Sequence, residues 1–496
     1  MHRLATRAAA PSHVFPCQRM PPFRHGHYAR RTAHCRVLLS SLSCITRPIS
    51  TDAASFEAGP SQQAQVLHKK ILGARMFTLN RPEKLNALTL SMIRNMTPQL
   101  KAWDVSKLAK VILLKGLDGG RFCAGDDILE VLLKTRTKDP DCLRFFQEKF
   151  WLIQMISTLQ TPFISVLDGY ALGGAIGLFG HCPFRIATEK TIFAMPETSL
   201  GLFPSSGASF FLPKLDGQIG TYLALTGSRI EGAHTFYAGI ASHYVPSVRL
   251  PALEDRLIDL EISDYEIIHR VIEEFVEPPT TDSSAFSHEI RDIIDRCFCY
   301  DTIDEIIAAL DHQKPSTFVR ETKQKLLSAS PTSLRVTLKA LRKAETMTLC
   351  ECLAMEFDLI QKFMVTKDFH EGIDAMFISK HRRKPHWQPQ FLDQLSEDDI
   401  TQLYFSYASP NDLSFPSTLD MHQYPYARYS LPSENSVREA VTGDGNGFGP
   451  ENRLKSRKEV LEWFVKGTQG KRGVREKVLD VLSRRTIDSP NGLVWT

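Results

Sequence analysis

The stretch that decides the fold is Asp168-Gly169-Tyr170-Ala171-Leu172-Gly173-Gly174-Ala175-Ile176-Gly177. It follows the apolar run Pro162–Leu167, so the pattern predicts a buried strand that turns into a helix at a pair of glycines. A glycine pair at a helix N-terminus presents free N–H groups and the positive end of the helix dipole to an anion. Close packing of the helix on a sheet would also require small residues here. A dinucleotide-binding loop is disfavoured, because the spacing is G-G-x-x-G and not G-x-G-x-x-G.

Two other segments combine glycines with polar groups. The first, Arg121–Ile128, follows a predicted strand, and an N–H from it could complete an oxyanion site with the glycine pair. The second, Ala194–Pro204, places Glu197 after a strand and among apolar residues. Such surroundings raise the pKa of a carboxyl group and suit it to acid or base chemistry. A helix-capping or ion-paired glutamate is the alternative at this point.

Short strands alternate with helices in the first half of the chain, and helical patterns dominate after about residue 206. The predicted strands are Val66–Leu72, Ala74–Leu79, Val111–Leu114, Pro162–Leu167, Phe184–Thr188 and Thr191–Ala194. The predicted helices of that half are Thr89–Trp103, Leu143–Leu159 and Gly173–Cys182. This order predicts an α/β fold with a helical C-terminal half.

Charge is distributed unevenly along the 496 residues. The net charge of +4 divides into +8 over residues 1–50, −9 over residues 51–450 and +5 over residues 451–496. A composition of 43% hydrophobic and 23% charged residues excludes a chain that is disordered throughout. The acidic middle argues against a core that wraps nucleic acid. Ten cysteines do not make a disulfide scaffold, so a reducing compartment is favoured.

The first fifty residues contain eight arginines and no acidic residue. This composition predicts a mitochondrial transit peptide over residues 1–55, and therefore the mitochondrial matrix as the destination. A basic disordered tail is the alternative. No uncharged apolar run of membrane-spanning length occurs, so we expect no membrane span.

In combination, these motifs resemble the crotonase (enoyl-CoA hydratase/isomerase) superfamily and, within it, the 3-hydroxyisobutyryl-CoA hydrolases. The resemblance spans about residues 66–412, which we call the family domain. It rests on Leu79–Pro82, Leu85–Leu88, Phe122–Gly125, Gly173-Gly174, Ala187–Lys190, Phe193–Thr198, Gly201–Pro204, Leu225–Gly227, Ala238–Ala241, Ser330–Leu334, Asp368–Gly372, Lys384-Pro385 and Trp387.

The resemblance implies a spiral of ββα units that binds an acyl-CoA thioester and needs no separate cofactor or metal. It places the catalytic glutamate at Glu197 and the two oxyanion N–H groups at Asp126 and Gly174. The CoA side would be lined by Asn86, Ala87 and Leu88.

Three residues depart from the hydrolase pattern. Ser205 stands where the hydrolases carry a second catalytic aspartate, and a serine hydroxyl cannot replace a carboxylate as a proton acceptor near neutral pH. Asp126 replaces a glycine, which puts a carboxylate beside the expected negative intermediate. Lys149 replaces an acid in the helix before the glycine pair, and it is a candidate partner for Asp126.

Two functions are therefore predicted. By resemblance, the chain is a mitochondrial 3-hydroxyisobutyryl-CoA hydrolase of valine breakdown, with Ser205 as the weak point of the site. The alternative is a catalytically weakened relative that serves as a structural component of the small subunit of the mitochondrial ribosome. The sequence makes no prediction of the oligomeric state of the chain.

The C-terminal extension, residues 413–496, leaves the hydrolase pattern. It contains an aromatic segment at Tyr424–Tyr429, read as extended, and a glycine-rich linker at Gly443–Pro450. A capping box at Ser456 and a periodic run from Val474 predict two helices, and the polar face of the second is basic. The extension either docks on the family domain or contacts RNA or protein of the ribosome.

Two cysteine pairs, Cys297/Cys299 and Cys350/Cys352, have spacings unlike those of zinc sites, and we expect core or surface thiols. Cys123 lies beside the first glycine loop, where a packing role is expected.

Overall fold

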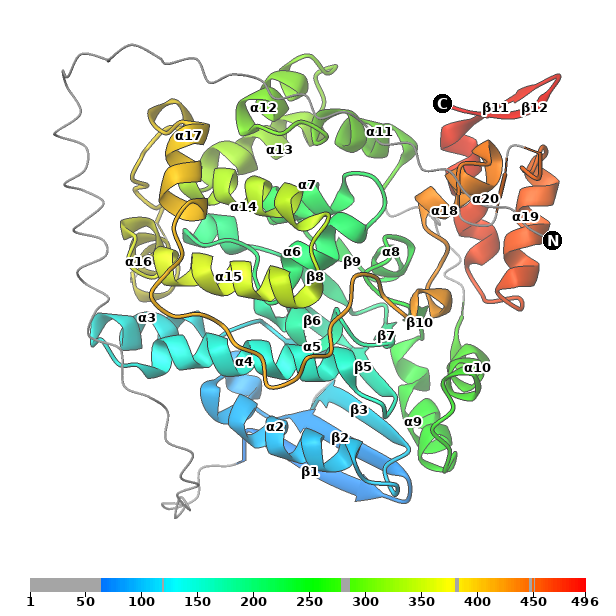
Figure 1. The fold of residues 1–496 in the computed structure, drawn as a ribbon, viewed down its shortest axis with the longest axis horizontal. Helices are drawn as coiled ribbons and strands as arrows, with labels where there is room; N and C mark the ends of the chain where they lie inside the picture. The colour runs from blue at the N-terminus through cyan, green and yellow to red at the C-terminus, as the bar shows by residue number, and fades with distance from the viewer. Residues whose placement is uncertain (1–63, 118–119, 278–285, 380–382, 446–447, 450) are drawn as a thin grey trace, which may run out of the picture. The chain divides into compact units, whose positions relative to one another are not determined.

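A six-stranded sheet begins the family domain and carries most of its apolar runs. The computed structural model describes residues 64–117, 120–277, 286–379, 383–445, 448–449 and 451–496; the predicted transit peptide therefore lies outside the described residues. The strand order is β1 (Val66–Ile71), β2 (Ala74–Leu79), β3 (Val111–Gly116), β5 (Phe163–Leu167), β7 (Phe184–Ala187) and β10 (His243–Tyr244). Only β1 and β2 pair antiparallel. The central strands are buried because helices cover this sheet (Figure 1).

A second sheet of four strands positions the candidate site. Its order is β4 (Gly120–Cys123), β6 (Gly169–Leu172), β8 (Ile192–Ala194) and β9 (Ile230–Glu231). Strands β4, β6 and β8 pair parallel, so their carboxyl ends meet at one edge. The sequence did not single out β4, because four residues with a glycine and an arginine carry no strand pattern. The predicted helix at Gly173–Cys182 is shorter than expected: a 3₁₀ turn, η2 (Gly173–Ala175), leads into α5 (Ile176–Phe179).

Helices make up the rest of the family domain, and they dominate its second half as predicted. The first half contains η1 (Pro82–Lys84), α2 (Leu90–Asp104), α3 (Ile128–Arg136), α4 (Asp141–Thr158), η3 (Glu197–Leu200), α6 (Ala208–Phe211), η4 (Leu212–Lys214), α7 (Ile219–Thr226) and α8 (Ala233–Tyr237). The second half contains η5 (Ser247–Arg249), α9 (Leu250–Ile258), α10 (Tyr265–Phe275), α11 (His288–Cys297), α12 (Ile303–Asp311), α13 (Thr317–Ser328), α14 (Pro331–Ala344), α15 (Leu349–Phe363), α16 (Lys367–Ile373), η6 (Asp374–Ile378), η7 (Leu392–Gln394), α17 (Glu397–Ile400) and η8 (Thr401–Phe405). No helix among the described residues is long and apolar enough to cross a membrane.

The main core contains side chains from both sheets and from the helices around them. Helix α4 packs against both α2 and α15 (Figure 1). Phe150 of α4, Phe179 of α5 and Phe193 of β8 are fully buried, and their rings belong to one continuous apolar cluster. Burial of side chains this large is the dominant favourable term in folding the domain.

The C-terminal extension packs on the family domain through an apolar cluster. It consists of η9 (Ala427–Tyr429), α18 (Glu434–Thr442), α19 (Arg457–Gly467), α20 (Val474–Arg485) and the hairpin β11 (Thr486–Ser489) and β12 (Gly492–Trp495). Helix α19 begins at the predicted capping box of Ser456. Val437, Val460 and Val478 are buried together with Phe236 and Tyr237 of α8. All described residues belong to one compact unit, so the contacts within the chain do not separate the extension from the family domain. The boundary at residue 412 therefore stays a prediction.

The aromatic segment of the extension differs from its expected extended form. Its last three residues form the 3₁₀ turn η9, and the ring of Tyr429 is buried against Phe184 of β7. The cause is tertiary: burying the ring favours a turn that a local reading of the segment does not predict.

Opposite charges complete the docking of the extension. Lys477 pairs with Asp216 of the family domain, and Arg485 pairs with Asp295. The Lys471 ammonium lies 2.6 Å from a Glu273 carboxylate oxygen and is fully buried. The excess of acid in the middle of the sequence and the excess of base at its end therefore meet within one chain. These basic side chains are already paired and are not free for an external anion.

Glu434 provides the test of this docking. It lies 3.3 Å from Arg291, 3.0 Å from Arg484 and 2.6 Å from Arg485. Burial alone would raise the pKa of Glu434, but the three guanidinium groups outweigh it and lower that pKa to about 2. Glu434→Gln should lower the free energy of unfolding at pH 7 by about 2–3 kcal/mol, measured by denaturant titration.

The sign of the pH dependence follows from the lowered pKa. The stabilisation is present above the ordinary carboxyl range and is lost as pH falls towards 2, so the difference between wild type and Glu434→Gln should shrink there. The control is Glu439→Gln on the same helix, whose carboxylate contacts Asn435, with an expected cost below about 1 kcal/mol. Equal effects of the two variants would contradict this account.

Candidate active site

Three strand ends bring the predicted site residues together. Asp126 follows β4, Gly174 follows β6 and Glu197 follows β8. The β4 and β6 loops approach closely, because a β-carbon on Gly125 would stand 3.3 Å from the Gly174 nitrogen. The geometry thus joins the two loops that the sequence assigned to an oxyanion site, although the roles of these residues stay predictions.

Gly173 allows the glutamate to reach this position. Its backbone has φ +50°, and a β-carbon there would stand 2.6 Å from Glu197 Oε1. Any larger residue would therefore push the carboxyl group away and strain the backbone. The first glycine of the pair serves the placement of Glu197, and the absence of a side chain at the second leaves room for the Asp126 carboxylate.

Glu197 lies in the buried, apolar environment that the sequence predicted. Glu197 is the first residue of η3 and is 7% exposed. Its Oε2 atom has no hydrogen-bond partner among the described residues. Burial raises the pKa of Glu197 to about 8, with a smaller increase from Asp126 and a decrease from Lys149. The carboxyl group is therefore largely protonated at neutral pH and could act as an acid.

The raised pKa gives a testable pH dependence. Between about pH 5 and 8 the folded protein keeps a proton on Glu197 that the unfolded chain releases, so stability should fall as pH rises. The slope from this group is at most about 1.4 kcal/mol per pH unit. Denaturant titrations should show that Glu197→Gln removes this part of the slope. Parallel slopes for the two proteins would contradict the assignment.

Asp126 and Lys149 form a buried ion pair inside the site. Lys149 Nζ lies 2.6 Å from Asp126 Oδ2, and the two side chains are 1% and 9% exposed. The ammonium is also 4.9 to 5.5 Å from the ring centres of Phe145, Phe146 and Phe150. The sequence named Lys149 as a candidate partner for Asp126, and the structure shows this pair.

The carboxylate of this ion pair lies against the second glycine. Asp126 Cγ and Oδ2 lie 2.6 Å from the position where a β-carbon of Gly174 would stand. A substrate oxygen bound beside Gly174 would therefore lie close to the Asp126 carboxylate. Repulsion between the two negative charges would weaken such binding, and Lys149 offsets part of that repulsion.

Ser205 lies in a buried loop that a second carboxylate holds. Ser205 is 2% exposed. Glu356 of α15 accepts hydrogen bonds from the Gly207 N–H at 2.8 Å and from the Ser209 N–H and hydroxyl at 3.0 and 2.6 Å. The sequence gave no signal for Glu356, because it is an ordinary acidic residue within an amphipathic helix.

The loop predicted to line the CoA side braces Asp126. Asn86 is buried at φ +57°, and its side-chain amide donates to the Arg121 carbonyl at 2.7 Å. The Leu88 N–H donates to the Gly125 carbonyl, and Ala87 accepts from the Arg81 guanidinium. Cys123 is buried beside this loop, and burial raises its thiol pKa to about 12, which suits packing and not nucleophilic chemistry.

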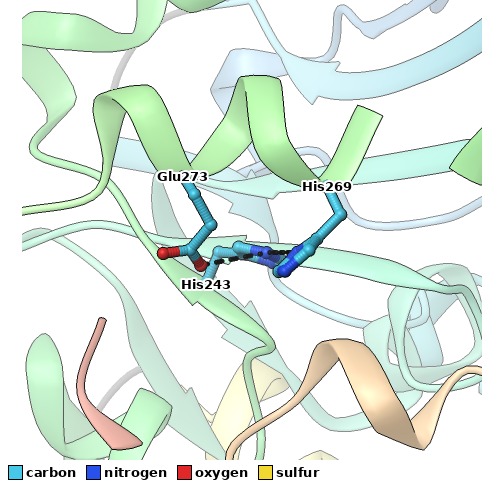
Figure 2. Close-up of side chains that lie close together, drawn as sticks. All are labelled: His243, His269 and Glu273. Atoms are coloured by element: carbon cyan, nitrogen blue, oxygen red, sulfur yellow. Dashed lines mark hydrogen bonds and ion pairs between the residues drawn. The ribbon is translucent and has the colours of Figure 1, made fainter. Parts of the chain in front are cut away.

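Among the described residues, one group of three metal-ligand side chains lies close together. His243 Nε2 is 2.9 Å from His269 Nδ1 and 3.5 Å from Glu273 Oε1 (Figure 2). However, Glu273 Oε1 also contacts the Lys471 ammonium, and Oε2 accepts from the Arg472 N–H. The carboxylate is already neutralised by a cation of the extension, so we assign this cluster to docking. Neither cysteine pair belongs to it.

The α/β fold and the three converging loops place the chain in the crotonase-like class of proteins. The chain belongs to the enoyl-CoA hydratase/isomerase family, whose sequence model matches residues 74–405. A carnitinyl-CoA dehydratase from Mycobacterium thermoresistibile has the same fold, with a TM-score of 0.66 and 29% identity over 72% of this chain and 100% of that one. An enoyl-CoA hydratase from Rhodobacter sphaeroides 2.4.1 has a TM-score of 0.63 and 28% identity over 71% of this chain and 100% of its own.

Two kinds of relative are similar along most of their length. The small ribosomal subunit protein mS47 of Neurospora crassa is 39% identical, over 89% of this chain and 90% of its own. The mitochondrial 3-hydroxyisobutyryl-CoA hydrolase of Homo sapiens is 40% identical, over 71% of this chain and 91% of its own. Both relatives named by the sequence analysis are thus confirmed as relatives. The match to the ribosomal protein is long enough to include residues beyond 405, which the family model does not reach.

Proposed function

We propose that this chain is a structural component of the small subunit of the mitochondrial ribosome, built on a hydrolase fold. The observation that carries the proposal is the buried Asp126–Lys149 ion pair, which puts a carboxylate directly against Gly174, one of the two residues expected to bind an oxyanion. Ser205 adds to it, because a hydroxyl stands where the hydrolases carry an aspartate. Each change alone would weaken catalysis, and together they indicate a site that no longer needs to turn over substrate.

The length of the similarity supports the same proposal. The ribosomal relative aligns over more of the chain than the hydrolases do, although the hydrolases align over almost all of their own length. The hydrolases are thus too short to match the whole chain, and we attribute the unmatched part mainly to the C-terminal extension. The buried cations of the extension already form ion pairs with the family domain. In a ribosome, the extension would therefore contact its neighbours through its solvent-exposed surface.

The second candidate is hydrolysis of 3-hydroxyisobutyryl-CoA in valine breakdown. Glu197 favours it, since a buried carboxyl group with a raised pKa is retained at the catalytic position of the resemblance. In that function, the N–H groups of Asp126 and Gly174 would hold the oxyanion. For either function we propose import into the mitochondrial matrix, directed by residues 1–55.

Sedimentation of a mitochondrial lysate tests the ribosomal function. The chain should migrate with the small subunit in a sucrose gradient at low salt, and it should stay with the subunit when the large subunit is split off. Free 3-hydroxyisobutyryl-CoA added to the lysate should not displace it. Recovery only in the soluble fractions at low salt would rule out the ribosomal function and leave the hydrolase.

A further inference from the structure

A pocket of about 360 Å³ lies between the family domain and the C-terminal extension, outside the candidate active site. Its walls come from β7 and η4 on one side and from the segment around η9, α18 and α19 on the other. A volume of this size falls in the range of small-molecule sites. None of the residues assigned to the acyl-CoA site lines it.

The pocket contains a buried guanidinium group without a carboxylate partner. Arg185 is 7% exposed and donates to the carbonyls of Ile240 and Cys182 at 2.9 Å and to the Ser430 hydroxyl at 3.3 Å. Within the described part of the chain, no acid forms an ion pair with it. A buried charge without a counter-ion is costly, and an anion bound in the pocket would offset that cost.

A second cation on the same wall has the same property. Lys214 donates to the Phe210 carbonyl at 3.1 Å, and its ammonium is 3.4 Å from the centre of the Phe210 ring. No ion pair of Lys214 with a described acid is formed either, and burial lowers its pKa. The acid that does line the pocket, Asp216, is satisfied, because it accepts from Lys477 and from the Glu434 N–H.

The remaining walls are aromatic and hydroxyl-bearing. Phe211, Tyr424 and Tyr426 line the pocket together with Ser433. Tyr237 also lines it, is 1% exposed, and has a hydroxyl without a hydrogen-bond partner among the described residues. Proteins bind nucleotides through a similar combination of groups. Cationic side chains contact the phosphate, and aromatic side chains stack on the base.

We propose that this pocket binds a nucleotide phosphate, either as a free mononucleotide or as the phosphorylated end of an RNA strand. Arg185 and Lys214 would face the phosphate, Tyr237 would donate to it, and the aromatic walls would contact the base. Arg428, on the exposed side of the same pocket, would add a third positive charge at the entrance. The proposal does not depend on ribosome association, because its observations lie wholly within this chain.

Isothermal titration of the full chain with AMP tests the proposal, with adenosine as the probe that lacks the phosphate. AMP should bind at low salt, and adenosine should bind at least about tenfold more weakly, since charge-assisted contacts to phosphate are lost. Lys214→Met, which keeps most of the apolar stem, should weaken AMP binding by about tenfold or more. Arg428 is exposed, and Arg428→Gln should weaken binding less; thermal melting checks that the loss of its hydrogen bond to Tyr429 does not unfold the chain.

The matched control is Lys458→Met, because Lys458 is 82% exposed and lies outside the pocket. Its affinity for AMP should equal that of the wild type. Equal binding of AMP and adenosine, an equal effect of Lys214→Met and Lys458→Met, or no binding at about 1 mM would overturn the proposal.

A short RNA with or without a 5′-phosphate distinguishes the two sources. Competition by the phosphorylated strand alone assigns the pocket to an RNA end. If neither strand competes with AMP, and Lys214→Met still weakens AMP binding, the pocket is assigned to a free mononucleotide.

Discussion

The triple variant Asp126→Gly, Lys149→Glu, Ser205→Asp is expected to hydrolyse 3-hydroxyisobutyryl-CoA about 10²-fold faster than the wild type, or more. These substitutions introduce the residues of the hydrolase pattern. The glycine removes the carboxylate that lies against Gly174, and the glutamate avoids leaving a buried ammonium without a partner. The aspartate supplies the second group that can exchange a proton with the substrate or water.

Thioesterase rates measured by release of free CoA decide this prediction. The control adds Glu197→Gln to the triple variant, and its rate should return to the wild-type level, because the gain must pass through the buried glutamate. Thermal melting of all variants checks that they remain folded. A wild-type rate equal to that of the triple variant would contradict the ion-pair account and favour the native hydrolase.

Removing one partner of the buried ion pair is expected to cost about 3–5 kcal/mol in the free energy of unfolding. Lys149→Met leaves the Asp126 carboxylate buried without a counter-ion, and Asp126→Asn leaves the Lys149 ammonium among three aromatic rings. The double variant should cost less than either single change, because a neutral amide and a thioether tolerate the apolar surroundings.

Denaturant titration of the four proteins gives the coupling energy between the two side chains. The matched control is the more exposed pair Glu130–Lys134, one turn apart on α3, where Lys134→Met should cost less than about 1 kcal/mol. Additive costs for Asp126→Asn and Lys149→Met would mean that the two side chains do not support each other, contrary to the geometry.

Much of the fold follows from local patterns. The helix predicted at Thr89–Trp103 forms as α2, with Thr89 as its N-cap, and the predicted capping box of Ser456 begins α19. The apolar runs at Val111 and Phe163 become central strands of the six-stranded sheet. Where the sequence prediction fell short, at β4 and at the turn η9, the elements are short and depend on neighbours distant in sequence.

The candidate site divides in the same way. The glycine pair and Glu197 are recognisable in sequence, because a backbone turn and an isolated acid among apolar residues leave local signals. The hydrogen bonds of Glu356 to Gly207 and Ser209 leave no local signal in the sequence. Glu356 lies 149 positions from Gly207 and 147 positions from Ser209. Its importance depends on which loop the helix faces, and tertiary packing sets that.

The sequence by itself determined the family, the three loops of the site and the three departures at Asp126, Lys149 and Ser205. Only the tertiary structure decided what two of those departures do. Lys149 lies on α4 and Asp126 in the loop after β4, and an ion pair forms between them because the fold places that loop beside α4 in a buried space. Likewise, composition showed an acidic middle and a basic end, but only packing showed that their charges neutralise each other within one chain. Electrostatic energy depends on distance and burial, and neither is written in the order of the residues.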